Sequence, residues 1–188
     1  AKRIAEFIGL NDYVFFVSRV KLEGKAAYIE LKQDGKDVFI AVDDRLVSAS
    51  EHSVLATLAH EICHKYLHHH RLDIREVIRS YENEVLTDIC TVYLGLGKLM
   101  LNGCQYETIY HDNESTNTTI VNIGYLSKRK LAAVYNLVCS MRNIGQEEAE
   151  RNLSHDALSA VRSVASKYRN VYYNTFSDFD FAHQLLMK

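Results

Sequence analysis

Residues 48–70 read SASEHSVLATLAHEICHKYLHHH, and this stretch decides how the centre of the chain folds. Its apolar residues recur at the spacing of one face of an α-helix. Ser48 and Glu51 form the S-x-x-E pattern of a capping box, which marks the start of a helix. The stretch therefore predicts an amphipathic helix from about Glu51 to about His69.

The predicted helix carries the string His60-Glu61-Ile62-Cys63-His64. Side chains four residues apart lie about 40° apart around a helix axis, so both imidazoles point to one side. This arrangement suits two ligands of one tetrahedral zinc ion, with Glu61 beside them but not on the metal. We predict one Zn²⁺ per chain, held by His60 and His64, with Glu61 as the general base that activates water.

A second helical pattern spans roughly residues 74–94 and contains the string Asn83-Glu84-Val85-Leu86-Thr87-Asp88. Catalytic zinc sites commonly use two histidines and one glutamate, and a ligand histidine needs a carboxylate behind it to fix its tautomer. Glu84 and Asp88 share one helix face, so we predict Glu84 as the third ligand and Asp88 as the partner of a ligand histidine. The alternative is that the histidines and the acidic pair are solvated surface residues.

The two motifs resemble those of the gluzincin metallopeptidases, the thermolysin-like group of zincins, whose pattern is HExxH followed by NExxxD on a second helix. Glu84 follows His64 by 20 residues, which is similar to the thermolysin spacing. The chain is also similar to an uncharacterised group of bacterial zincin-like proteins, in the strings Glu84 to Asp88, Gly95-Leu96-Gly97 and Gly124-Tyr125-Leu126. The first resemblance implies a zinc-dependent peptidase.

His70 is a rival third ligand, because it occupies the position of the third histidine in the metzincin pattern HExxHxxGxxH. That pattern needs a glycine where this chain has Leu67, since the backbone must leave the helix sharply there. Without the glycine, His68, His69 and His70 are expected to continue or end the helix as polar residues. We therefore prefer Glu84.

Zincins often recruit a tyrosine or histidine from elsewhere to stabilise the developing oxyanion. We predict Tyr125 for this role because Gly124 can bring its backbone close to the site; the alternative is a tyrosine packed in the core. Cys104 is a further candidate, as an autoinhibitory thiol that binds the metal. Other side chains with suitable chemistry are His111, Tyr110, Tyr106 and His155. The basic cluster Lys128 to Lys130 is interpreted as a solvated helix face.

Three segments rich in β-branched and aromatic residues precede the metal-binding motifs and predict strands. They are Tyr13–Val20, Ala26–Leu31 and Val38–Val42, with a turn at residues 33–36. We expect them to form a small antiparallel sheet within a mostly β region, residues 1–45. The strand Val38–Val42 directly precedes the HExxH helix, so we expect an extended peptide to bind beside it through main-chain hydrogen bonds.

The rest of the chain predicts a single domain, residues 1–188, of the α+β class. Residues 48–101 form the metal-binding helix pair, and residues 123–188 are helical. Residues 102–122 form a long polar loop that we expect to border the cleft; the alternative is a surface excursion that points away from the metal. Within the last region, Ser127 caps a helix from about Lys128 to Met141, and another helix spans about Ser154 to Tyr168.

Composition narrows the function classes. The formal net charge of −2 gives no electrostatic case for nucleic acid or a membrane surface as partner. No apolar run reaches the ~18 residues of a membrane span, and residues 1–10 lack the apolar core of a signal peptide. The four cysteines are widely spaced and form no CxxC pair, so we expect a reducing, cytoplasmic environment.

Together these features predict a zinc peptidase that hydrolyses peptide bonds in one or a few cytoplasmic protein partners. The main alternative is a non-catalytic zinc-binding interaction module, and a third is hydrolysis of a non-peptide amide. A structural zinc site is usually closed by four protein ligands. Glu61 is not needed for ligation, so its presence favours catalysis.

Overall fold

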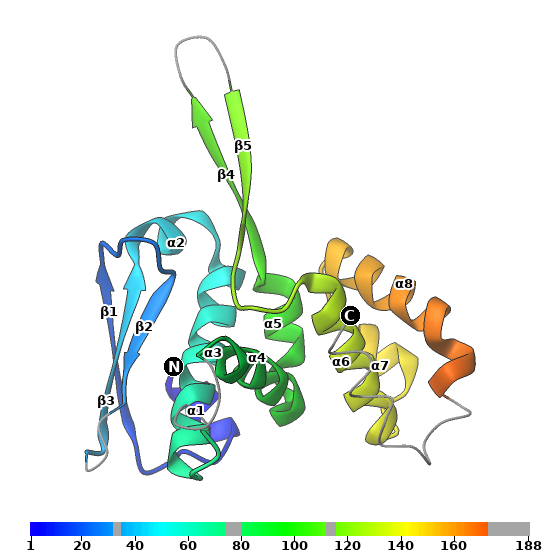
Figure 1. The fold of residues 1–188 in the computed structure, drawn as a ribbon, viewed down its shortest axis with the longest axis horizontal. Coiled ribbons are helices and arrows are strands. Elements are labelled where there is room, and N and C mark those ends of the chain that lie inside the picture. The colour runs from blue at the N-terminus through cyan, green and yellow to red at the C-terminus, as the bar shows by residue number, and fades with distance from the viewer. Residues whose placement is uncertain (32–34, 74–79, 112–115, 173–188) are drawn as a thin grey trace.

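The computed structural model describes residues 1–31, 35–73, 80–111 and 116–172, and it has the predicted α+β class. Helix α3 (Glu51–His69) lies at its centre and has the predicted bounds. A small sheet packs on one side of α3, and the remaining long helices lie on the other side (Figure 1). His60 and His64, two of the candidate metal ligands, therefore lie on the central helix, between the two halves of the structure.

The N-terminal sheet contains β1 (Val14–Val20), β2 (Ala27–Glu30) and β3 (Asp37–Asp43), in the order β1-β3-β2. β2 and β3 are antiparallel, but β1 pairs with β3 in parallel, so the prediction of an antiparallel sheet was wrong. The reason is that β1 does not pair with β2, its neighbour in sequence. It pairs instead with the edge of β3 that β2 leaves free. The strand expected beside the site, β3, is therefore central, and β2 is the edge strand nearest to α3 (Figure 1).

One apolar cluster holds the sheet, helix α1 (Lys2–Phe7) and α3 together. Its largest and most buried side chains are Leu10, Val38, Ile40, Val42, Leu46 and Ile62. Burial of an aliphatic side chain of this size stabilises a fold by about 1.5–3 kcal/mol. Ile62 is fully buried and lies between the two histidines of the HExxH string, so the sheet fixes the face of α3 opposite the ligands.

The start of α3 differs from its prediction in one detail. A short helix that the sequence did not predict, α2 (Asp44–Ala49), follows β3 and is capped by Asp43. Because α2 includes Ser48, that residue cannot cap α3. The cap is Ser50, whose hydroxyl oxygen accepts a hydrogen bond from the backbone N–H of Ser53 at 3.2 Å.

A second apolar cluster joins α3 to the helices that follow it. These are α4 (Ser80–Thr91), the π-helical turn η1 (Val92–Leu96), α5 (Gly97–Gly103), α6 (Lys128–Met141), α7 (Gln146–Glu150) and α8 (His155–Tyr172). Ser127 caps α6 as predicted. Residues 74–79 of the predicted second helix and residues 173–188 lie outside the described residues. Gly103 permits the close approach of α5 to α3, because a Cβ there would lie 2.0 Å from the carbonyl oxygen of His52.

Residues 102–122 do not form the predicted polar loop. Apart from the end of α5 they form an antiparallel hairpin of β4 (Gln105–His111) and β5 (Thr116–Asn122), with residues 112–115 outside the described part. The prediction was wrong because the polar run in the middle outweighed the β-branched and aromatic residues that flank it. The hairpin projects away from the body, and its base leads into residues 123–126 beside α3 and α4 (Figure 1).

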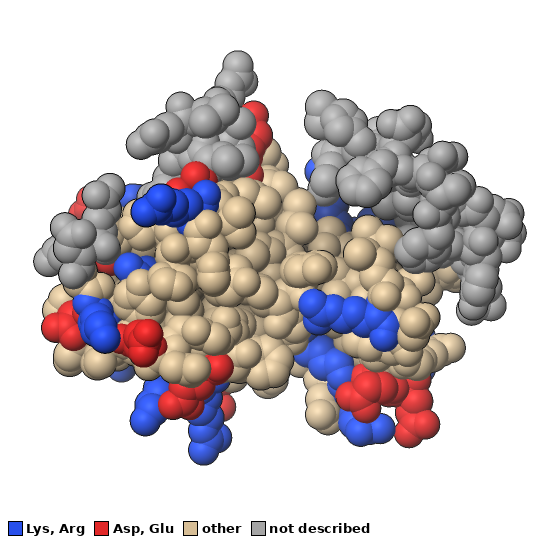
Figure 2. Space-filling view, turned by 90° about the horizontal axis from the view of Figure 1, so that it is seen from below, with Lys and Arg blue, Asp and Glu red and all other residues tan. Residues whose placement is uncertain are grey.

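The face drawn in Figure 2 shows no concentration of one charge among the described residues. On the face drawn in Figure 2, the described acidic and basic side chains are interspersed around a largely uncharged centre. Among the described residues, no helix is both long and apolar enough to cross a membrane. Cys63, Cys90, Cys104 and Cys139 form no disulfide.

The contact between α5 and α3 yields a test of the fold. Gly103→Ala places a methyl group against backbone that cannot move away, so we expect a loss of about 1–3 kcal/mol in the free energy of unfolding, measured by urea denaturation. Gly145→Ala is the control, because a Cβ at Gly145 meets nothing within 4 Å. Equal stability of the two variants would contradict the packing described for α3 and α5.

Candidate metal centre

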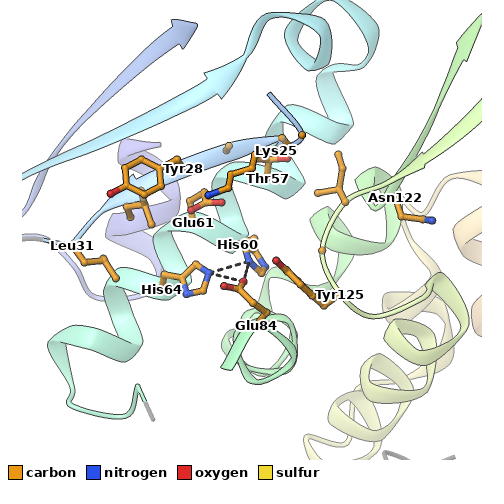
Figure 3. A pocket seen from close by; sticks show the side chains of 16 residues that line it. Lys25, Tyr28, Leu31, Thr57, His60, Glu61, His64, Glu84, Asn122 and Tyr125 are labelled. Atoms are coloured by element: carbon orange, nitrogen blue, oxygen red, sulfur yellow. Dashed lines mark hydrogen bonds and ion pairs between the residues drawn. The ribbon is translucent and has the colours of Figure 1, made fainter. Parts of the chain in front are cut away.

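Three side chains from two helices converge on one point (Figure 3). His60 and His64 lie one turn apart on α3, and Glu84 reaches them from α4. The two histidine Nε2 atoms are 3.1 Å apart, and Glu84 Oε2 lies 3.1 Å from that of His60 and 3.0 Å from that of His64. Ligands of a tetrahedral zinc ion with bonds of about 2.0–2.1 Å are about 3.3 Å apart. The three atoms thus approximate one face of such a tetrahedron.

The tautomer of His60 is set by Asp88. The Nδ1 of His60 lies 2.8 Å from Oδ1 of Asp88, whose side chain is fully buried. A carboxylate oxygen accepts, so the Nδ1–H of His60 donates, which leaves the lone pair of Nε2 directed at the centre of the site. The predicted pairing of Asp88 with a candidate ligand histidine is therefore present in the structure.

The tautomer of His64 is set by Thr87, which sequence reasoning did not single out. The Thr87 hydroxyl donates to the carbonyl oxygen of Asn83 at 2.8 Å, so its proton is already used. Its oxygen lies 3.1 Å from Nδ1 of His64 and must accept the Nδ1–H. Both candidate ligand histidines therefore present an unprotonated Nε2 to Glu84.

Two nitrogen lone pairs and a carboxylate oxygen this close together require a cation. A proton is one solution: burial disfavours the charged form of His60, but its hydrogen bonds with Asp88 and Glu84 prevail and raise its pKa to about 10. Burial likewise raises the pKa of Glu84, but its close contacts with the rings of His60 and His64 prevail and lower it to about 2. A divalent metal is the other solution, and the donor set of two imidazoles and one carboxylate fits one.

Glu61 is placed differently from the three candidate ligands. It lies next to His60 on α3 and lines the same pocket, but it does not belong to the group that could hold a metal ion. Its carboxylate points towards the pocket in Figure 3. Burial raises the pKa of Glu61. A buried carboxylate beside a metal site, but not on it, is positioned to accept a proton.

The second oxygen of Asp88 holds the chain at the base of the hairpin. Its Oδ2 accepts hydrogen bonds from the backbone N–H groups of Tyr125 at 2.7 Å and Leu126 at 2.8 Å. Gly124 makes this approach possible: its φ is +80°, and a Cβ there would lie 2.8 Å from Asp88 Oδ1. The string Gly124-Tyr125-Leu126 therefore has a structural reason, which is to receive Asp88.

Tyr125 borders the candidate metal centre. Its ring is stacked on that of His60 with 6.4 Å between centroids, and it contacts Tyr81 edge-on at 5.9 Å. Its side chain lines the pocket and is 49% exposed, so it is not the core tyrosine of the alternative interpretation. Its role in catalysis stays a prediction.

A pocket of about 370 Å³ runs past these residues. One wall is the segment from Gly24 to Leu31, including β2, and the opposite wall consists of residues 122–125. His60, Glu61, His64 and Glu84 form the floor between them (Figure 3). The site is therefore a cleft with an edge strand along one side.

Most rival residues lie away from the metal centre. His70 ends α3, and its ring packs against Tyr66 and His69. Cys104 is buried in the second apolar cluster, and its thiol is directed at the carbonyl oxygen of Leu101. Tyr106 packs against the first cluster, and His155 is exposed at the start of α8. The side chains of Tyr110 and His111 lie outside the described ones.

Thr57 and Lys25 also line the cleft and were not predicted. Thr57 lies four residues before Glu61 on α3, so the helical spacing alone could have placed it on the same face. No sequence signal identifies Lys25, because its approach to the cleft depends on how β2 pairs with β3.

Comparisons of the chain with models of protein families, with curated proteins and with solved structures find no match. The resemblance to the gluzincins therefore rests on the HExxH and NExxxD motifs and on the convergence of their side chains.

The ligand assignment can be tested by metal content. We expect His60→Ala, His64→Ala and Glu84→Ala each to lose bound zinc, because each removes one of three ligands. Asp88→Ala should weaken binding by about 10–100-fold through the orientation of His60. His70→Ala is the control and should leave affinity unchanged in a chelator competition. Loss of zinc in His70→Ala with retention in Glu84→Ala would refute the assignment.

The contact between Gly124 and Asp88 yields a separate prediction. Gly124→Ala drives a methyl group into the carboxylate that orients His60, so zinc affinity should fall by about 10-fold or more. Gly9→Ala is the control, because Gly9 has a φ of +84° and no atom within 4 Å of its would-be Cβ. Both glycines have a similar positive φ, so Gly9→Ala shows how much an alanine in this backbone conformation alone affects the protein. Unchanged zinc affinity in Gly124→Ala would show that Asp88 does not act through this packing.

Proposed function

We propose that this protein is a zinc-dependent peptidase in which His60, His64 and Glu84 hold the metal and Glu61 is the general base. One observation carries the proposal: three ligand atoms 3.0–3.1 Å apart lie beside a buried carboxylate that is not one of them. Imidazole and carboxylate ligands at tetrahedral spacing favour zinc. Zinc bound there would polarise the scissile carbonyl group and acidify water.

The chain's own residues supply the proton transfers. Glu61 accepts a proton from the attacking water and delivers it to the leaving amine. Its place on α3, beside His60 and facing the cleft, supports this role. Tyr125, from the opposite wall, is proposed to stabilise the developing oxyanion through its hydroxyl.

The edge strand β2 is proposed to bind the substrate main chain. The backbone N–H of Asp43 donates to the carbonyl oxygen of Ala26 at 2.9 Å, so the polar backbone groups of Ala26 point towards β3. Antiparallel strands alternate in this respect, and the N–H and C=O groups of Ala27 and Ile29 therefore point away from β3. Both residues line the cleft, which suits an extended peptide that pairs with β2.

This pairing revises the predicted place of the substrate. The sequence favoured the strand now seen as β3, but β1 and β2 cover both of its edges. The cleft between β2 and residues 122–125 suits a single extended chain. A flexible segment of one or a few cytoplasmic proteins is therefore the proposed substrate, and the absence of a disulfide among the described cysteines is compatible with that compartment.

The proposal predicts different effects of two matched substitutions. Glu61→Gln should retain zinc and fold but lower kcat by about 10²–10⁴-fold, because the amide cannot accept the proton. Glu82→Gln, at an exposed position on α4, is the control and should leave kcat unchanged. A peptide library is first digested with the zinc-loaded protein, and mass spectrometry identifies a cleaved peptide. The kcat of each variant is then measured on that peptide. Cleavage by Glu61→Gln at the wild-type rate would rule out the mechanism.

A further inference from the structure

Thr57 is a buried polar residue that the proposed mechanism does not use. Its side chain is 2% exposed and lines the cleft, and its hydroxyl has no hydrogen-bond partner in the described part of the chain. Leaving a buried hydroxyl unpaired costs about 1–3 kcal/mol. A ligand bound in the cleft is a candidate hydrogen-bond partner for this hydroxyl.

Lys25 provides a positive charge at the same end of the cleft. Among the described residues that line it, Lys25 is the one lysine or arginine. Its ammonium lies 5.9 Å from the ring centre of Tyr28, and Figure 3 shows the side chain reaching over the cleft near Thr57 and Glu61. No described carboxylate lies within ion-pair distance of Lys25. Its charge interacts with that of Glu61 over a longer distance in the same cleft, and it can also attract an anionic ligand there.

The two side chains have complementary chemistry. An ammonium offers charge and several donors, and a hydroxyl offers one directed donor, which together suit the two oxygens of a carboxylate. Lys25 lies two residues before Ala27, which lines the cleft and whose backbone groups point away from β3. A peptide paired with β2 at Ala27 therefore carries its neighbouring residue, or its terminus, past Lys25.

We propose that Lys25 and Thr57 form a carboxylate-binding subsite that selects the substrate of this peptidase. The carboxylate is either the side chain of an aspartate or glutamate or the free α-carboxylate at the end of a peptide. In the first case the protein is an endopeptidase with an acidic preference, and in the second it removes residues from a C-terminus. The inference rests on the proposed peptidase function, because it assigns a specificity to the same cleft.

The experiment uses four peptide hydroxamates as probes, since the hydroxamate group binds zinc independently of the subsite. One pair differs in a glutamate or a glutamine, and the other pair in a free or an amidated C-terminus. Their affinities for the zinc-loaded full chain are measured by calorimetry at low and high salt. In one of the two pairs, we expect the peptide with the carboxylate to bind about 10-fold more tightly than the peptide with the amide. High salt should reduce this preference, because Lys25 is solvent-exposed.

Variants assign the preference to the two side chains. In Lys25→Met, the affinities of the two hydroxamates in that pair should differ by less than about two-fold. In Lys25→Glu, the amide should bind more tightly than the carboxylate. Thr57→Val should lower the preference about three-fold or more, whereas Thr57→Ser should retain it. Lys21→Met is the matched control, because Lys21 is exposed in the same connection between β1 and β2 but does not line the cleft.

The outcomes separate the subsite from the peptidase function. If all four hydroxamates bind the wild type with zinc dependence but equal affinity, the subsite does not exist and the proposed function stands. If a preference is present but Lys25→Met and Lys25→Glu leave it unchanged, the subsite is not formed by these residues. If no hydroxamate binds the zinc-loaded protein, the peptidase proposal fails, and the subsite falls with it.

Discussion

The carboxylate of Asp88 is the group on which the rest of the site depends. A buried charge is costly unless its oxygens are hydrogen-bonded, and each oxygen of Asp88 has partners. One oxygen orients His60 on α3, and the other accepts the N–H groups of Tyr125 and Leu126. Segments far apart in the sequence are thereby joined at one side chain. The orientation of a candidate metal ligand and the position of one cleft wall are therefore set by the same contact.

His64, the second candidate ligand histidine, is oriented by a hydroxyl group and not by a carboxylate. This contact helps to explain why α3 and α4 must pack in one register. His64 needs an acceptor for its Nδ1–H, and Thr87 provides it because the Thr87 hydroxyl proton is committed to the Asn83 carbonyl. Glu84, Thr87 and Asp88 all belong to α4. Sliding α4 by one residue along α3 would break the three contacts together, so the apolar packing of α3 and α4 also determines the geometry of the candidate ligands.

The sequence predicted those parts of the structure that depend on spacing within one helix. His60, Glu61 and His64 share a face because of helix geometry, and the same reasoning paired Glu84 with Asp88. It failed where pairing between distant segments decides the outcome. Whether β1 joins β2 or β3, and whether residues 105–122 form a hairpin, depends on non-local hydrogen bonds that leave a weak trace in local composition. Hydroxyl groups were missed for a related reason, since Thr57 and Thr87 resemble any other threonine until their neighbours are known.

Charge balance links the candidate metal centre to the proposed subsite. A zinc ion bound at this centre would offset Glu84 and Asp88, and the remaining carboxylate, Glu61, lies in the same cleft as the ammonium of Lys25. When Glu61 holds a proton during the proposed reaction, its negative charge is lost and the ammonium of Lys25 has no anionic neighbour at that end of the cleft. A substrate carboxylate bound by Lys25 and Thr57, as proposed, would restore the charge balance at that stage. Interactions that strengthen as the reaction proceeds increase kcat, whereas interactions equal in both states do not. The proposed subsite therefore implies that an acidic group at this position contributes to turnover as well as to recognition.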